Sequence, residues 1–173
     1  LNVHLKLKKI YKGLITIIAP RHIQRINEIR KMCENFDLSY QILNKNDLIL
    51  DDKEILLINS YGNLPSFLRH SKSVFVGKST IRKLKSVGGQ NPIEAAKFGC
   101  KIYHGPFIYN FKEIYEILYE NKISKEINNS EELMKNLEID LQDIKKDDEK
   151  FLNRLEILGQ KTLNDTMEKI NNF

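Results

Sequence analysis

One stretch, Ser73 to Phe111, limits the folds open to this chain more than any other. It begins with a short apolar run, Val74 to Val76, which is typical of a buried strand. Residues 88–94 (Gly-Gly-Gln-Asn-Pro-Ile-Glu) follow, and a further short run at Lys101 to His104 predicts another strand. A strand, a glycine loop, a helix and a strand in this order predict a βαβ unit in a parallel sheet.

The order of residues after the glycines predicts where the helix of this unit begins. Asn91 is a favoured N-cap, Pro92 suits the first helical position, and Glu94 falls at the third. The helix is short, because Gly99 is a typical C-terminal stop. Its free N–H groups point at the glycine loop, which makes a ready site for a phosphate.

Glu94 has two interpretations that the residues alone leave open. It closes a capping box with Asn91, which is an ordinary structural role. Alternatively it contacts a bound nucleotide. Because a carboxylate is repelled by a phosphate, its partners in that case are neutral hydroxyls, most naturally those of a ribose.

The motif at residues 88–94 resembles the donor-binding half of the 3-deoxy-D-manno-octulosonic acid (Kdo) transferases of lipopolysaccharide synthesis. The resemblance runs from about Leu14 to Phe111. Four further segments carry it: Ala19-Pro20-Arg21-His22, Tyr61-Gly62-Asn63-Leu64, Gly105-Pro106 and Asn110-Phe111-Lys112.

Members of that family have a GT-B fold, two Rossmann-like domains with the active site in the cleft, and this chain resembles the C-terminal one. The implied fold class is α/β, a Rossmann-like parallel sheet flanked by helices, with a helical C-terminal tail. Residues 1–128 then form a nucleotide-sugar-binding domain that lacks its first strand. Residues 129–173 form helices that pack on the same domain.

The family transfers Kdo from CMP-Kdo to lipid A precursor, so the resemblance implies these partners together with an N-terminal domain. It implies a location at the cytoplasmic face of the inner membrane. The general base of the family is a glutamate of the N-terminal domain, so no catalytic residue is expected in this chain. No cofactor and no metal ion are expected, because Arg21 and the helix N-terminus can neutralise the departing phosphate.

The resemblance also assigns site residues. Those implied for nucleotide binding are Pro20, Arg21, Tyr61, Gly62, Asn63, Asn91, Pro92, Ile93 and Glu94. Those implied for the donor pocket are Ser79, Gly88, Gly89, Gln90 and Asn110.

Each of the upstream residues has a plainer alternative. Arg21 offers a planar fork suited to phosphate, but it also reads as a surface arginine. Tyr61 is placed to stack on cytosine, or it is an ordinary turn tyrosine. Neither His22 nor His104 has a neighbour in sequence that marks it as a general base.

Two features depart from the family pattern. Lys78 stands where the family usually has the second glycine of Val-Gly-Gly-Ser, and residues 81–87 make the following loop longer than usual. This loop is basic, through Lys78, Arg82, Lys83 and Lys85. Two interpretations stay open for this loop: its positive charges attract an anionic donor or acceptor substrate, or they are simply solvated and have no binding role.

Composition agrees with a single domain without a membrane span. The 173 residues are 41% hydrophobic, and the longest apolar run, residues 14–19, is only strand-length. Cys33 and Cys100 lack metal-ligand spacing, so both are predicted to be reduced core thiols in a cytosolic protein. The net charge of +5 suits anionic partners, but no aromatic residues are interleaved with the basic ones as nucleic-acid binding requires.

Outside the central stretch, hydrophobic periodicity predicts the remaining elements. Helices are expected at 1–10, 23–36, 64–68, 110–120 and from 129, with Ile26, Ile29, Met32 and Cys33 facing inward in the second. Strands are expected at 14–18, 40–43, 54–59 and 123–127. A further helical stripe extends from Phe151 to Ile170. Two other functions stay open: a GT-B transferase for another nucleotide sugar, and a non-catalytic nucleotide-binding domain.

Overall fold

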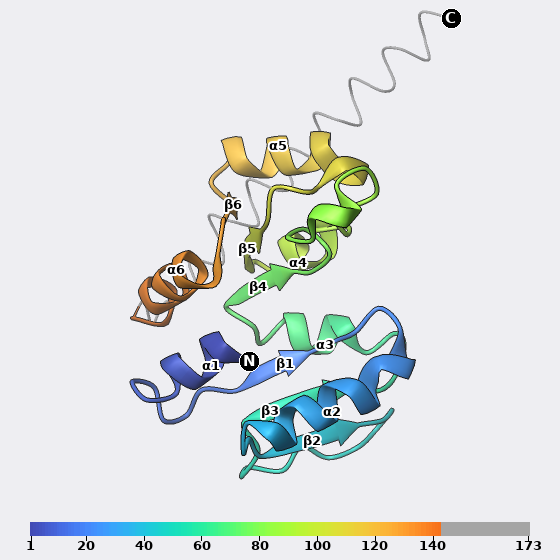
Figure 1. The fold of residues 1–173 in the computed structure, drawn as a ribbon, viewed down its shortest axis with the longest axis vertical. Coiled ribbons are helices and arrows are strands. Elements are labelled where there is room, and N and C mark those ends of the chain that lie inside the picture. Colours follow the sequence, from blue (N-terminus) through green and yellow to red (C-terminus); the bar gives the residue numbers. More distant parts are fainter. Residues whose placement is uncertain (143–173) are drawn as a thin grey trace, which may run out of the picture. The chain divides into compact units, whose positions relative to one another are not determined.

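The computed structural model describes residues 1–142, and the described chain falls into two compact units (Figure 1). The first comprises Leu1–His70 with Ser130–Glu138. The second comprises Ser71–Asn129 and the end of the last described helix from Ile139 onward. The predicted division at residue 128 stays a prediction, as does the stripe from Phe151 to Ile170, which lies outside the described residues.

The first unit contains a parallel sheet of three strands in the order β1-β3-β2. In chain order its elements are α1 (Asn2–Leu7), β1 (Thr16–Ile18), a 3₁₀ turn η1 (Ile23–Arg25), α2 (Ile26–Asn35), β2 (Tyr40–Leu43), β3 (Ile55–Ile58) and α3 (Leu64–Leu68). The helix expected at 1–10 ends earlier, and the helix expected at 23–36 opens with the 3₁₀ turn.

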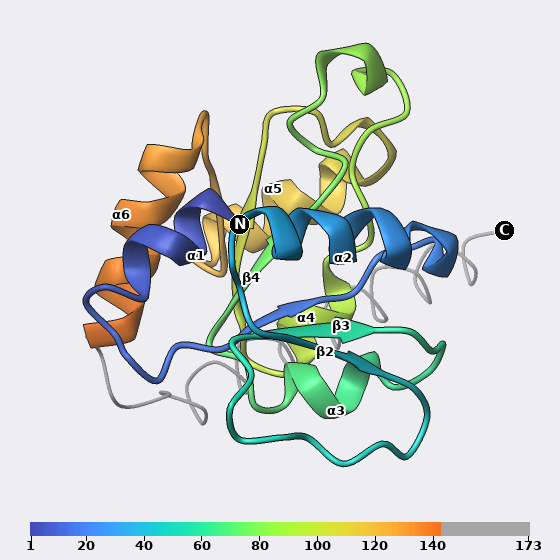
Figure 2. The same ribbon diagram turned by 60° about the horizontal axis from the view of Figure 1, so that its bottom comes forward.

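Strand β3 carries the core of this unit on both of its faces. Ile55 and Leu57 pack with Ile26 and Cys33 of α2, whereas Leu56 and Ile58 pack with Phe67 of α3. Helices α2 and α3 accordingly lie on opposite faces of the sheet (Figure 2). A continuous apolar strand of this kind is what a parallel sheet covered on both faces requires.

The expectation that Met32 faces inward is wrong, because 43% of its surface is exposed. The buried stripe of α2 follows Ile26, Ile29 and Cys33, at the i, i+3, i+7 spacing of a single helix face. Met32 comes one position before Cys33, about 100° away around the helix, and so lies at the margin of that stripe.

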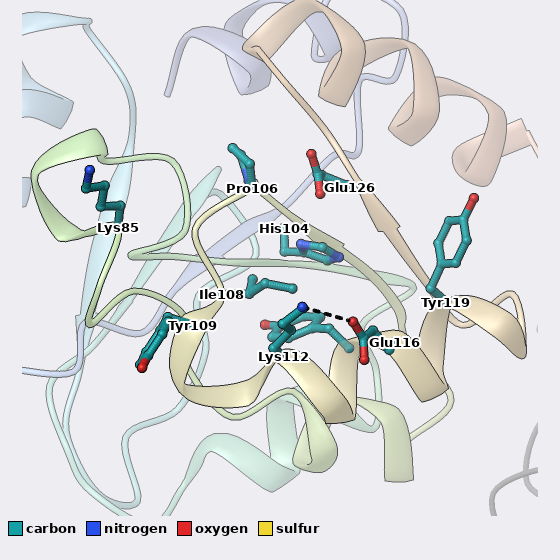
Figure 3. Close-up of a pocket in the computed structure, with 10 residues that line it drawn as sticks. Lys85, His104, Pro106, Ile108, Tyr109, Lys112, Glu116, Tyr119 and Glu126 are labelled. Atoms are coloured by element: carbon teal, nitrogen blue, oxygen red, sulfur yellow. Dashed lines mark ion pairs between the residues drawn. The ribbon is translucent and has the colours of Figure 1, made fainter.

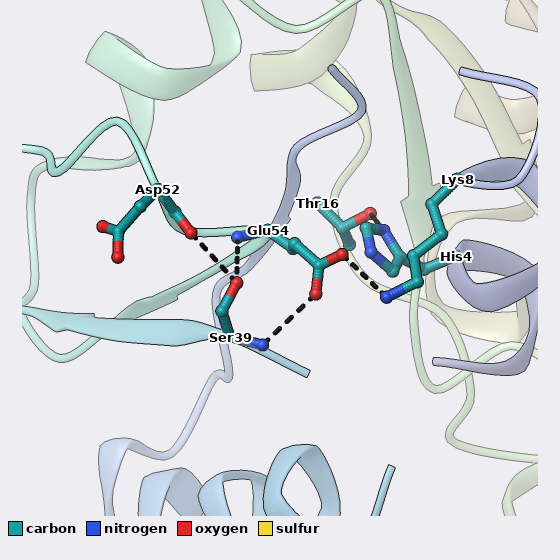
Figure 4. A network of polar contacts seen from close by, with 6 residues as sticks. All are labelled: His4, Lys8, Thr16, Ser39, Asp52 and Glu54. Carbon is teal, nitrogen blue, oxygen red and sulfur yellow. Dashed lines mark hydrogen bonds and ion pairs between the residues drawn. The ribbon is translucent and has the colours of Figure 1, made fainter. Parts of the chain in front are cut away.

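A polar cluster fixes the start of β3 (Figure 4). The Glu54 carboxylate accepts hydrogen bonds from Lys8 Nζ at 2.7 Å and from the Ser39 backbone N–H at 3.2 Å. Next to it His4 is buried, and its Nδ1 lies 2.8 Å from Thr16 Oγ1. The cluster ties α1 to the chain that enters β2 and β3.

The second unit contains another three-stranded parallel sheet, in the order β4-β5-β6. Its elements are β4 (Ser73–Val76), a 3₁₀ turn η2 (Arg82–Leu84), α4 (Ile93–Lys97), β5 (Lys101–His104), a 3₁₀ turn η3 (Tyr109–Phe111), α5 (Lys112–Glu120) and β6 (Ser124–Glu126). Helix α6 (Ser130–Gln142) follows. The α/β class with parallel sheets and flanking helices is confirmed, with the described strands hydrogen-bonded in two sheets instead of one.

Side chains of β5 alternate between the two faces of this second sheet. The His104 ring packs on Tyr115 of α5, with ring centroids 4.3 Å apart. Tyr103 points the other way and donates a 2.6 Å hydrogen bond to Asp140 near the end of α6. Cys100, just before the strand, is buried and is not in a disulfide, and the same holds for Cys33 in the first unit, as expected for reduced core thiols.

Candidate functional site

The glycine loop of the second unit leaves β4 and leads into α4, where the sequence places the nucleotide. Strand β5 is the parallel neighbour of β4, and its following loop carries Gly105 and Asn110. Both loops therefore start at the carboxyl edge of the same sheet, where open α/β sheets bind ligands.

Gly88, Gly89 and Gly105 in these loops are required by packing and by turn geometry within the protein. A Cβ at Gly88 would lie 2.5 Å from the Phe107 carbonyl oxygen, and one at Gly105 would lie 2.4 Å from that of Ser79. Gly89 has a φ of +83°. Gly89 therefore forms a tight turn, and Gly88 and Gly105 lie close to backbone atoms of neighbouring loops.

Ser79 joins the two loops from inside. It is fully buried, its hydroxyl donates to the Val76 carbonyl at 2.7 Å, and it accepts from the Gly105 N–H at 2.8 Å. These contacts give Ser79 a structural role in this conformation. Its predicted place in the donor pocket stays a prediction.

Helix α4 begins at Ile93, one residue later than expected. Asn91 Oδ1 accepts a 2.9 Å hydrogen bond from the Ile93 N–H, so one N–H expected to face a phosphate is already paired. Pro92 is buried at the helix entry, and Glu94 is exposed.

The Glu94 carboxylate makes no hydrogen bond to Asn91 or to any other residue of the described chain. The capping box, which was the plainer interpretation of this residue, is therefore absent from the described structure. Glu94 is left in a solvent-facing position, where a ligand hydroxyl can reach it.

Gln90 and Asn110 support the same loop. The Tyr115 hydroxyl donates to the Gln90 carbonyl at 3.0 Å, and Asn110 Nδ2 donates to the Val87 carbonyl at 3.1 Å. Helix α5 and the loop after β5 thus hold the glycine loop from one side. Neither contact occupies the amide of Gln90.

Lys78 adopts a left-handed backbone conformation, with φ of +63°. Its carbonyl oxygen accepts a 3.1 Å hydrogen bond from the Gly89 N–H, and this bond joins the two ends of the basic loop. Glycine adopts this conformation without strain, which explains why the family pattern Val-Gly-Gly-Ser has a glycine at this position.

In the first unit, the remaining predicted residues follow two neighbouring strands. Pro20 and Arg21 come after β1, and Tyr61, Gly62 and Asn63 come after β3. The two corners therefore share one edge of the β1-β3-β2 sheet.

The side chains at these corners are available to a ligand. Arg21 is exposed and forms no ion pair within residues 1–142, and Tyr61 is 67% exposed. Gly62 has a φ of +85°, which the turn needs, and Asn63 Nδ2 donates to Ser60 Oγ at 3.0 Å. Asn63 therefore shapes the turn.

Sequence reasoning missed a pocket of about 550 Å³ in the second unit (Figure 3). Its lining is Lys85, His104, Pro106, Ile108, Tyr109, Lys112, Tyr115, Glu116, Tyr119 and Glu126. None of the predicted site residues lines it. The only available signal was a polar residue at the end of one predicted strand, His104, and a second one near the end of another, Glu126.

His104 is the buried polar group of this pocket, with 3% of its surface exposed. Its Nδ1 lies 2.8 Å from the Gly105 carbonyl oxygen, which accepts a hydrogen bond only if that nitrogen carries the proton. Burial lowers the pKa of His104, so the ring is neutral near pH 7. Nε2 is left as an acceptor.

Two further properties concern the described residues. No three His, Cys, Asp or Glu side chains among them are grouped to hold a metal ion. No helix in the described part of the chain is both long enough and apolar enough to cross a membrane.

Comparison with known proteins finds several sequence relatives that share one name. The 3-deoxy-D-manno-octulosonic acid transferase of Haemophilus influenzae is 28% identical over 130 residues, or 75% of this chain. That of Rickettsia bellii is 28% identical over 96% of this chain, and that of Aquifex aeolicus is 24% identical over 76%. The chain is a homologue of the Kdo transferases.

This Kdo transferase homologue spans only part of its relatives, namely 30% of the Haemophilus protein and 40% of the Rickettsia bellii protein. No family model matches it. A crystal structure of the C-terminal CMP-Kdo binding domain of WaaA from Acinetobacter baumannii superimposes with a TM-score of 0.78. The match covers 92% of this chain and 80% of that domain, at 20% identity. The fold expected from the sequence, that of a C-terminal GT-B domain, is thereby confirmed.

Proposed function

We propose that this chain is the donor-binding half of a glycosyltransferase that moves Kdo from CMP-Kdo to a lipid A precursor in lipopolysaccharide biosynthesis. The observation that carries the proposal is the corner at residues 88–94 in a homologue of the Kdo transferases. There Glu94 is exposed and unpaired within the described chain. Such a carboxylate suits two ribose hydroxyls, which are donors.

The roles proposed for the two units differ. In the first unit, Arg21 binds an anionic group of the donor and Tyr61 stacks on a base. In the second unit, Glu94 binds ribose, while Gly88 and Gly89 let the loop fold tightly beside it. Arginine neutralises charge that develops on a departing phosphate, and no metal ion is needed for that step.

Transfer itself is proposed to require residues outside this chain. An acceptor hydroxyl must lose its proton on the face of the sugar opposite the leaving CMP. No described residue combines a general base with a partner that orients it at the predicted donor site. The chain would act at the cytoplasmic face of the inner membrane through the larger enzyme.

The proposal is tested by calorimetric titration of the chain with CMP, and with UMP, UDP and GDP as alternatives. We expect weak binding of CMP and weaker or no binding of the others. Preference for UDP or GDP would instead support a GT-B transferase with another donor. Binding of all four alike would support a non-catalytic nucleotide-binding domain.

A matched pair of variants tests the residue assignment. Glu94→Gln should weaken CMP binding by roughly 1.5 to 3 kcal/mol, because hydrogen bonds from ribose to a charged acceptor are lost. Glu113→Gln is the control, since Glu113 is also exposed and also stands second in its helix, α5. Equal CMP affinity in both variants would remove Glu94 from the proposed site.

A further inference from the structure

The pocket between α5 and the ends of β5 and β6 presents two hydrogen-bond acceptors side by side. His104 and Glu126 are register partners on neighbouring parallel strands. Register partners point to the same face, and the strands lie about 4.8 Å apart. Both residues line the pocket (Figure 3).

Neither acceptor is used by the rest of the described chain. His104 Nδ1 is committed to the fixed carbonyl of Gly105, so Nε2 offers a lone pair and has no partner among residues 1–142. The Glu126 side chain is exposed and likewise forms no hydrogen bond or ion pair there. A buried imidazole with an unpaired acceptor that faces a pocket is an expected feature of a ligand site.

Aromatic rings and cations complete the lining. Tyr109 and Tyr119 are 69% and 65% exposed, so their rings offer flat apolar surface to a ligand. Lys112 pairs with Glu116 at 3.6 Å, which leaves Lys85 as a donor at the rim. Two lysines and two glutamates line the pocket, so their formal charges balance and the pocket does not select a strongly charged ligand.

We propose that this pocket binds a sugar ring through adjacent hydroxyl groups. Two vicinal hydroxyls can donate to His104 Nε2 and Glu126, while the apolar C–H face of the ring packs on a tyrosine. A volume of about 550 Å³ accommodates a monosaccharide with room for a second ring. The site uses none of the residues assigned above to the nucleotide.

Saturation-transfer NMR on the chain tests the proposal. The probes are the methyl glycosides of glucose, galactose, mannose and N-acetylglucosamine, together with free Kdo. Tetrahydropyran-2-methanol is the negative probe, because it keeps the ring but lacks the ring hydroxyls. We expect saturation of at least one sugar at millimolar concentration and none of the negative probe. Absence of transfer to every sugar, or equal transfer to the negative probe, overturns the proposal.

Surface variants locate the signal without endangering the fold. Glu126→Gln and Tyr119→Ala should each weaken sugar binding about tenfold, whereas Glu120→Gln should not change it, since Glu120 is exposed on α5 but does not line the pocket. His104→Gln is added after its NMR spectrum has been shown to retain the native dispersion. Binding that survives both surface variants overturns the proposal.

Sugar binding at the pocket can be tested separately from CMP binding at the proposed donor site. If Glu94→Gln abolishes sugar binding while Glu126→Gln does not, the sugar belongs to the donor site and the pocket proposal fails. If CMP fails to bind while sugar binding depends on Glu126, the pocket proposal stands and the proposed donor function fails.

Discussion

The hydroxyl of Tyr103 donates a 2.6 Å hydrogen bond to Asp140, 37 residues further along the chain. Ser73 Oγ, at 2.6 Å, and Lys101 Nζ, at 3.0 Å, converge on the same carboxylate. Burial and the neighbouring carboxylate raise the pKa of Tyr103, so the phenol stays protonated as the donor. This cluster fixes the end of α6 to β4 and β5.

Asp140→Asn should therefore lower the free energy of unfolding of the second unit by about 2 to 3 kcal/mol, because charge-assisted hydrogen bonds lose their acceptor. Tyr103→Phe should cost about 1 to 2 kcal/mol, and the double variant less than the sum. Lys101→Met is the control, with a small effect, since its side chain is 55% exposed. Urea denaturation of the wild type and the four variants measures these costs, and additive costs of the two single changes would contradict the coupling.

Lys78→Gly should stabilise the chain by about 0.5 to 1 kcal/mol, because it relieves the left-handed conformation of a residue with a Cβ. Lys122→Gly should gain a similar amount, since Lys122 has a φ of +60°. Lys78→Ala removes the same charge but keeps the Cβ, so it separates the two effects. A gain in the alanine variant equal to that in the glycine variant would assign the effect to charge.

Gly105→Ala should destabilise the second unit by about 2 kcal/mol or more, because the added Cβ meets the Ser79 carbonyl oxygen at 2.4 Å. Gly77→Ala is the matched control, since nothing lies within 4 Å of a Cβ there. Thermal unfolding of the two variants measures the difference. Equal melting temperatures would show that the two loops pack less closely.

Stability should fall as the pH drops below about 6.5, the usual pKa of histidine. Burial lowers the pKa of His4 and that of His104, so at acidic pH the unfolded state binds protons that the folded state does not bind. The stability that these two histidines contribute is complete above their pKa in the unfolded state. It is lost as the pH falls toward their lower pKa in the folded state. Glu54 partly opposes the shift at His4, and Glu126 partly opposes it at His104.

Denaturation at several pH values between about 5 and 8 measures this slope, whose upper limit is about 1.4 kcal/mol per pH unit for each histidine. His4→Gln should flatten the slope for the first unit, and His104→Gln should flatten it for the second. A slope that neither variant changes would assign the pH dependence to the carboxylates.

Local signals along the chain predicted the elements well and, for two strands, their bounds. Strands were expected at 40–43 and 101–104, and β2 and β5 have those bounds, because short apolar runs bounded by polar residues have few other uses in a parallel sheet. The corner at residues 88–94 was also visible, since glycine, asparagine and proline act on the backbone next to them.

Only the tertiary structure showed which polar groups are already paired. Ser79 stood next to a predicted ligand site, yet it is fully buried because Gly105, from a loop 26 residues away, packs directly on it. Glu94 carried a capping signal, yet its carboxylate is unpaired in the described chain. Neither outcome follows from the neighbours in sequence.

The sequence by itself thus determined the class of fold, the strands and the glycine corner, because these depend on hydrophobic periodicity and on backbone preferences of single residues. The tertiary structure decided the register that pairs His104 with Glu126 and the contact of Tyr103 with Asp140. Such contacts depend on how separate segments pack, and side-chain patterns along one segment carry little information about partners distant in the chain.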